Sequence, residues 1–196
     1  MPRYVAFLRA INVGGHNVKM EELRRLFAAL GYTGVESFIA SGNLIFSSPA
    51  RAAEALERQI EERLHAALGY EVRTFLRTDA EVAEIARHPA FPETEVSTAR
   101  AFNVGFLAAP LGSEARAKLA EFTNEVDAFH LHGREVYWLC RLKQSESSFS
   151  NAVFERSLRL RATFRGMKTV RGLAEKYPAA APKVAPPKRR PASAKR

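Results

Sequence analysis

The spacing of apolar residues changes repeatedly over the first 77 residues, and these changes predict alternating strands and helices. Apolar residues three and four positions apart predict a helix before Gly31 and another before Gly69, two glycines suited to ending helices. Ser48 and Pro49 have the residue types preferred at the N-cap and first position of the second helix. Short apolar runs predict four strands, at residues 4–8, 35–40, 44–46 and 71–77. The resulting order, strand–helix–strand–strand–helix–strand, is the split βαβ or ferredoxin-like pattern.

The rest of the chain partly repeats this order. Helical periodicity is found at residues 81–87, 113–122, 149–158 and 170–177. Strand-like runs are found at residues 101–107, 129–132 and 135–140, the last two joined by a turn at Gly133. We therefore predict an α+β fold of two ferredoxin-like subdomains, residues 1–77 and 78–177, consistent with a duplication.

Residues 178–196 differ in composition from everything before them. They contain five prolines and six basic residues with no acid, and removing these six charges from the formal net charge of +9 leaves +3. Such a segment has little to bury, so we expect a disordered basic tail. Non-specific contact with nucleic acid through this tail is one open expectation.

The composition of the chain also limits its location. Its hydrophobic share of 46% is ample for a packed core, and no apolar run approaches membrane length. The N-terminus shows no signal-peptide segment, and Cys140 is a lone thiol that fits a reducing compartment. These features predict a cytoplasmic protein with no membrane contact; they do not define an oligomeric state.

Two polar clusters mark a candidate site. In a split βαβ sheet, strands one and two run parallel and strand three lies between them in the opposite direction, so the strand-one exit and the hairpin lie at one edge. This topology brings together segments nearly thirty residues apart. Crevices outside strand ends are common ligand sites. The candidate ligand-binding residues are Arg9, Asn12, Gly14, Gly15, His16, Asn17, Ser41, Gly42 and Asn43.

The chemistry of these residues favours an anion or a small polar ligand. Gly14 and Gly15 can form a backbone nest, the helix beginning near Lys19 adds its positive end, and Arg9 can clamp a carboxylate or phosphate. The loop matches neither the P-loop nor the dinucleotide fingerprint, so no cofactor is expected. Binding is our preferred interpretation, an enzyme with its active site at the same edge is the alternative, and a purely structural loop explains the motifs equally well.

Other candidate chemistry is weaker. His130 and His132 alternate on one strand and so share a face, but no third ligand follows from the spacing, and we predict no metal. Cys140 has no histidine partner indicated, which favours a core residue over a nucleophile. The strand order also suggests an RNA-recognition module, yet strand three lacks its aromatic pair and Phe46 is better explained as core. Helix capping explains at least one of the serines at positions 145, 147, 148 and 150, and no base is visible for any of them.

The motifs resemble those of a known family. Residues 9–17 read Arg-Ala-Ile-Asn-Val-Gly-Gly-His-Asn, residues 41–43 read Ser-Gly-Asn, and residues 133–137 read Gly-Arg-Glu-Val-Tyr. These resemble a family of uncharacterised bacterial proteins catalogued as domain of unknown function 1697, over about residues 3–177. The resemblance implies an α/β fold with ferredoxin-like elements and no established activity. In the family's Thr-Thr-Arg-Asn-Trp-x-Thr motif, Arg165 and Thr169 are kept here and the Asn-Trp pair is lost.

Overall fold

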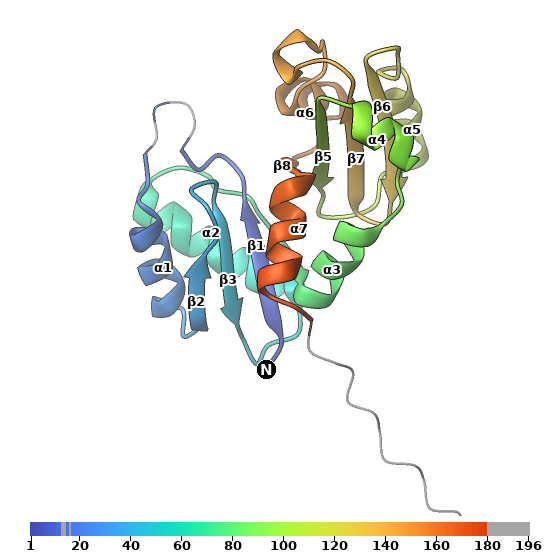
Figure 1. Cartoon of the computed structure of the whole chain (residues 1–196). Helices are drawn as coiled ribbons and strands as arrows, with labels where there is room; N and C mark the ends of the chain where they lie inside the picture. The colour runs from blue at the N-terminus through green and yellow to red at the C-terminus, as the bar shows by residue number, and fades with distance from the viewer. Residues whose placement is uncertain (13–14, 16, 180–196) are drawn as a thin grey trace, which may run out of the picture.

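The computed structural model describes residues 1–12, 15 and 17–179, and these form an α+β fold with two four-stranded antiparallel sheets (Figure 1). The predicted disordered tail therefore lies, from residue 180 onward, outside the described residues.

The first sheet has the predicted ferredoxin-like order. Its strands are arranged β2-β3-β1-β4, and every neighbouring pair is antiparallel. Tyr4, Ala6 and Leu8 alternate along β1 and join the core formed with α1 and α2, whereas Val5 and Phe7 belong to a second core on the other face. The elements of this sheet are β1 (Arg3–Leu8), α1 (Met20–Ala29), β2 (Thr33–Ser37), β3 (Asn43–Ser47), α2 (Ala53–Leu68) and β4 (Thr74–Thr78).

The second sheet repeats this topology. Its order, β6-β7-β5-β8, corresponds strand for strand to that of the first sheet. The correspondence extends to the turns, because Leu8 N donates to Gly42 O at 2.9 Å and Leu107 N donates to Arg134 O at 3.0 Å. The elements are β5 (Ala101–Phe106), α5 (Ser113–Ala120), β6 (Asp127–His132), β7 (Glu135–Cys140), α6 (Asn151–Leu158) and β8 (Thr163–Gly166).

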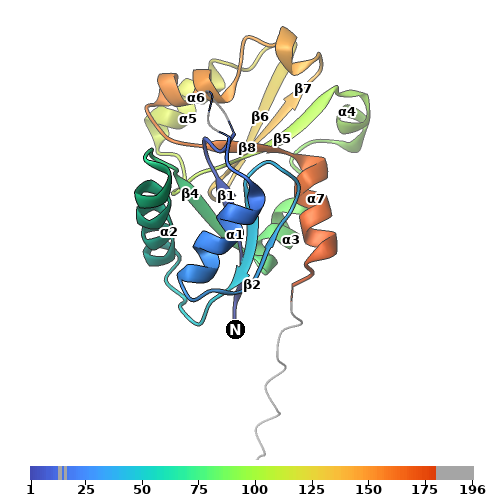
Figure 2. The ribbon, with the colours of Figure 1, turned by 90° about the vertical axis from the view of Figure 1, so that its left-hand side faces the viewer.

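Each sheet is followed by one more helix, and these two helices meet at the junction. α3 (Asp79–Arg87) follows β4 and α7 (Met167–Lys176) follows β8, and they pack against each other between the two sheets (Figures 1 and 2). Thr78 and Glu81 form a capping box that starts α3. Two short elements complete the described part of the chain, α4 (Glu93–Thr98) and the 3₁₀ turn η1 (Gln144–Glu146). We call β1 to α3 the first half and β5 to α7 the second half.

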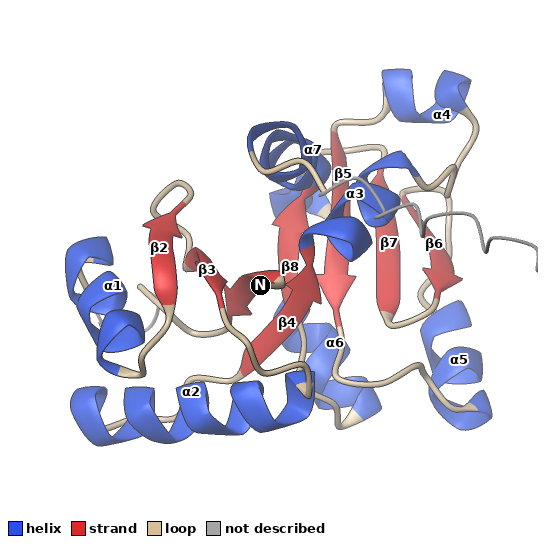
Figure 3. Cartoon of the chain, turned by 90° about the horizontal axis from the view of Figure 1, so that it is seen from below, coloured by secondary structure: helices blue, strands red, loops and turns tan. Residues whose placement is uncertain are grey.

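The halves share an apolar core. Figure 3 shows the two sheets side by side, with α1 and α2 on the first and α5 and α6 on the second. The faces that these helices leave uncovered contribute to one cluster, in which Phe7 of β1 stacks on Phe106 of β5 with ring centroids 3.8 Å apart. Val5, Val104 and residues of α3 and α7 complete this shared core.

Several predicted boundaries were wrong for local reasons. The second strand ends at Ser37 rather than residue 40, because Ile39 has a left-handed φ of +51° that leaves the strand conformation. Ser48 does not cap α2, which begins at Ala53; its hydroxyl accepts instead from Ala50 N at 3.2 Å in a turn. The fourth strand begins at Thr74, three residues later than predicted.

After the first half, α4 and β8 were missed, α6 begins two residues later than predicted and α7 begins three residues earlier. Ser150 caps α6 by accepting from Val153 N at 3.2 Å, which confirms a capping role for one of the serines.

Candidate functional site

The strand-one exit and the hairpin of the first half lie side by side, as the topology predicted. They line one cavity of about 440 Å³ together with residues of the second half. Arg9, Asn12 and Ser41 are in its lining, while Gly42 and Asn43 pack beneath it against Leu8 and Arg165. Gly15 and Asn17 are exposed and outside the described lining, and Gly14 and His16 lie outside the described residues.

Asn12 links the two segments. Its Oδ1 accepts from Val18 N at 2.7 Å, and its Nδ2 donates to Ala40 O at 3.5 Å. The hairpin partner of Asn12 is therefore Ala40, the residue just before the predicted turn at residues 41–43. Because its amide has a backbone partner in each segment, Asn12 holds the loop against the hairpin.

Arg9 has a protein partner. Its Nε and Nη2 donate to the two carboxylate oxygens of Glu155, each at 2.5 Å. This bidentate bond is the main reason why the pKa of Arg9 lies above its usual range. The guanidinium of Arg9, which we expected to bind a ligand, thus joins the first half to α6 of the second half.

Arg165 of β8 forms the floor of the cavity, and periodicity did not point to it. Its Nη2 donates to Leu8 O and Ser41 O, both at 2.8 Å, and its Nε donates to Asn43 Oδ1 at 2.6 Å. Its Nη1 donates to Thr163 Oγ1 and to Phe164 O. All five N–H groups are therefore used, and they hold both predicted segments in place. The signal that could have identified Arg165 was its place in the family motif.

The charge of Arg165 is not balanced by a carboxylate among the described residues. Each of its five acceptors is a neutral carbonyl, amide or hydroxyl oxygen. Burial in this setting lowers the pKa of its guanidinium to about 10.

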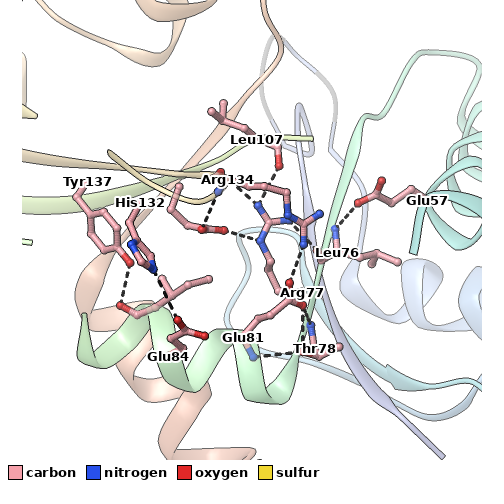
Figure 4. Close-up of polar contacts among 12 residues, drawn as sticks. Glu57, Leu76, Arg77, Thr78, Glu81, Glu84, Leu107, His132, Arg134 and Tyr137 are labelled. Atoms are coloured by element: carbon pink, nitrogen blue, oxygen red, sulfur yellow. Dashed lines mark hydrogen bonds and ion pairs between the residues drawn. The ribbon is translucent and has the colours of Figure 1, made fainter. Parts of the chain in front are cut away.

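The equivalent arginine in the first half does have a carboxylate. Arg77 pairs with Val5 of β1 as Arg165 pairs with Val104 of β5. Arg77 Nη2 donates to Leu107 O (Figure 4), as Arg165 Nη2 donates to Leu8 O. The side chains that accept from the Nε of each arginine, at the start of β7 and of β3, differ between the two halves.

Arg77 Nε donates to Glu135 at 2.6 Å, whereas Arg165 Nε meets Asn43. Asn43 and Glu135 occupy matching positions, opposite Phe7 and Phe106. The first pair is neutral overall and the second carries one positive charge.

Backbone strain gathers around the same cavity. Ala10 and Asn12, in its lining, have φ of +65° and +59°, and Ile39 beside Ala40 has φ of +51°. The left-handed conformation is tolerated by asparagine but is costly for alanine and most of all for the β-branched Ile39. The lining also contains Asn151, whose buried Oδ1 has no hydrogen-bond partner in the described structure.

The two histidines singled out in the sequence share a face and meet a third. His88, at the end of α3, has its Nε2 3.0 Å from His130 Nε2 and stacks on His132 with ring centroids 4.0 Å apart. Burial and these two imidazoles lower the pKa of His88. Glu84 lies 3.6 Å from His132 Nε2 (Figure 4). Within the described residues, no three His, Cys, Asp or Glu side chains are arranged to hold a metal ion.

Two further predicted roles can be placed. Cys140 is buried in the second half, where its thiol contacts Leu142 O and burial raises its pKa, as suits a core residue. Phe46 is fully buried in the core of the first half, as predicted. The helices of the described chain are too short or too polar for any of them to cross a bilayer.

Comparison with known proteins defines the fold and the family. No curated protein matches the chain. A solved structure, the conserved bacterial protein SP0830 from Streptococcus pneumoniae, is similar with a TM-score of 0.66 and 22% identity, covering 89% of this chain and 97% of that chain. This likeness supports the fold alone. A family model described as protein of unknown function (DUF1697) matches residues 1–137. The family resemblance is thereby confirmed, and the chain belongs to the DUF1697 family.

Proposed function

We propose that this protein binds a small anionic ligand in the cavity at the junction of its two halves. The observation that supports it most is the contrast between the two equivalent arginines. Arg77 is neutralised by Glu135, whereas Arg165, at the cavity floor, meets only neutral oxygens. A ligand carboxylate or phosphate would supply the missing negative charge.

The physical cost of the unbalanced charge supports this reading. Removing an ion from water costs on the order of several kcal/mol, and a nearby opposite charge offsets part of this cost. Since all five N–H groups of Arg165 are already used, the ligand would be held by charge and by other donors. The hydroxyl of Thr163 and the remaining Nη1 group of Arg9 line or border the cavity and can donate.

The cavity also favours a ligand with a donor of its own. Asn151 Oδ1 is buried in the lining without a partner, and a ligand hydroxyl or amine would satisfy it. A volume of about 440 Å³ is in the range of small-molecule sites. A small hydroxy acid or amino acid combines these properties.

The enzyme alternative has less support. The described lining supplies guanidinium, hydroxyl and amide groups, but no acid–base pair for proton transfer. His16 and the basic tail, on which the enzymatic and nucleic-acid alternatives depend, lie outside the described residues. Binding is therefore the function that the geometry supports best.

The test is the substitution Asn43→Asp, which places a carboxylate where the other half has Glu135. The new carboxylate should neutralise Arg165 and exclude a ligand anion, so lactate and phosphate should bind at least tenfold more weakly than to the wild type. The affinity is measured by NMR titration, following the amides of residues 8–12 and 163–165. The substitution also removes the bonds that Asn43 donates to Phe38 O and Ser41 Oγ, so thermal melts are needed to show that the fold is kept.

Asn124→Asp is the matched control. Asn124 is an exposed amide that also donates to a backbone carbonyl, that of Phe122, and the change gives the same net charge away from the cavity. It should leave ligand affinity unchanged. If the wild type binds no lactate or phosphate at millimolar concentration, or if Asn43→Asp binds them as the wild type does, the proposed function is wrong.

A further inference from the structure

A larger cleft is also lined by residues of both halves. Its volume is about 1110 Å³, and it shares no described lining residue with the smaller cavity. Phe75, Leu107, Pro110 and Leu158 give it apolar walls. Its basic side chains are Arg73, Lys118, Arg159 and Arg161.

Arg161 is only weakly paired, and the repeat of the fold shows why. In the first half, Glu61 accepts from Thr74 N at 2.8 Å and pairs with Arg73 at 2.9 Å. In the second half, Glu155 accepts in the same way from Ala162 N at 3.0 Å, but Arg9 occupies its carboxylate.

Arg161 is the residue of the second half that matches Arg73. Arg161 stands four positions before Arg165, and Arg73 stands four positions before Arg77. The side chain of Arg161 remains 3.8 Å from Glu155 and is 55% exposed. Its guanidinium is therefore available to a ligand.

Arg159 ends α6 at the position where the first half has a glycine, Gly69, at the end of α2. Gly69 ends α2 with a φ of +78°, and Arg159 ends α6 with a φ of +53°. Glycine takes this conformation without strain, whereas arginine does not. Arg159 is exposed at the cleft, and among the described residues no carboxylate is paired with it. A strained, charged residue in place of glycine suggests that its side chain has a role.

We propose that this cleft binds an organic phosphate with an aromatic or apolar part of nucleoside size. Arg159 and Arg161 are placed for the phosphate dianion, and Phe75, Leu107 and Pro110 for the apolar part. Glu121 pairs with Lys118 at 2.7 Å. Glu114 also lines the cleft and can accept from a ligand hydroxyl or amine.

The experiment is a titration of the wild-type protein with adenosine 5′-monophosphate, adenosine and inorganic phosphate. The two cavities share no described lining residue, so shifts at residues 157–161 report this cleft and shifts at residues 8–12 report the smaller cavity, and the two proposals are tested separately. The nucleotide should bind at least tenfold more tightly than either fragment, with NMR shifts at Phe75 and residues 157–161. Arg161→Gln and Arg159→Gly should each weaken binding at least fivefold.

Arg159→Gly keeps the helix end in its preferred conformation, so its melting temperature should hold or rise while affinity falls. Arg25→Gln, which removes an exposed charge on α1, is the control and should change nothing. The proposal is overturned if the nucleotide shows no binding at millimolar concentration. It is also overturned if phosphate alone binds equally well, or if both arginine variants keep the affinity.

Discussion

Arg77 and Arg165 occupy matching positions and differ in the group that meets their charge. Arg77 is 1% exposed, and burial lowers its pKa while Glu135 raises it. Truncating one partner of a buried ion pair leaves the other charge without compensation, which is far more damaging than losing a surface pair. The Arg77–Glu135 pair therefore stabilises the junction, whereas the charge of Arg165 has no carboxylate partner among the described residues.

Glu135→Gln should lower the free energy of unfolding by about 3–5 kcal/mol, because it leaves Arg77 buried and unpaired. The measurement is urea denaturation followed by circular dichroism. Glu121→Gln is the control; its partner Lys118 is 48% exposed, so the loss should stay below about 1 kcal/mol. Equal losses for the two variants would contradict the distinction drawn between buried and exposed pairs.

The three-histidine cluster joins α3 to β6, because His88 follows α3 and Glu84 of α3 lies 3.6 Å from His132 Nε2, so protonation there should affect the docking of α3. The folded-state pKa of His88 is lowered, which means that the unfolded chain binds its proton more readily. The contribution of His88 is therefore fully present above its unfolded pKa, about 6.5, and is lost as pH falls below that value toward the folded pKa.

The wild type should accordingly lose more stability between pH 7.5 and 5.5 than His88→Gln does. The comparison requires urea denaturation of both proteins at several pH values in this window. His65→Gln, at an exposed position of α2 away from the cluster, serves as the control for losing an imidazole. Identical pH slopes for His88→Gln and the wild type would rule out this role.

The elements that could be predicted from sequence are those with a clear period. The helix before Gly31 and the strand from Tyr4 to Leu8 carry enough apolar positions to show one. β8 does not, because its four residues include a single apolar side chain, Phe164, and it is held by pairing with β5. The left-handed Ile39 is likewise fixed by its surroundings rather than by its own preference.

Only the part of the site that lies in the first half could be predicted from the sequence. The meeting of the strand-one exit with the hairpin follows from the topology of one half. Arg165, Asn151 and Glu155 come from the second half, and their arrival depends on how two sheets pack. Periodicity predicts which face of a helix or strand is apolar, but it does not predict against which other element that face will pack.

The whole molecule should unfold as one unit. Each half has a core of its own, but the apolar cluster that contains Phe7 and Phe106 draws on both sheets and on α3 and α7, so either half alone would expose one apolar face of its sheet. We therefore expect the subdomain boundary predicted after residue 77 to separate two repeats of the topology, but not two units that unfold independently.

Leu23→Ala tests this cooperativity. Leu23 is fully buried in the core of the first half, and its truncation should cost about 2–5 kcal/mol. Trp138, the single tryptophan, lies in the second half. The fluorescence midpoint of Trp138 should fall together with the circular dichroism midpoint. Two separate transitions, with the fluorescence midpoint unchanged, would instead show that the halves unfold independently.

The pairing of Arg77 with Glu135 has a consequence for synthesis of the chain. The two residues are 58 positions apart, so at about 5–20 residues per second a ribosome adds Glu135 roughly 3–12 s after Arg77. During this interval β1 and β4 have an apolar face without Phe106 and an arginine without its carboxylate. The nascent first half is thus most open to chaperones and to aggregation until β7 has emerged.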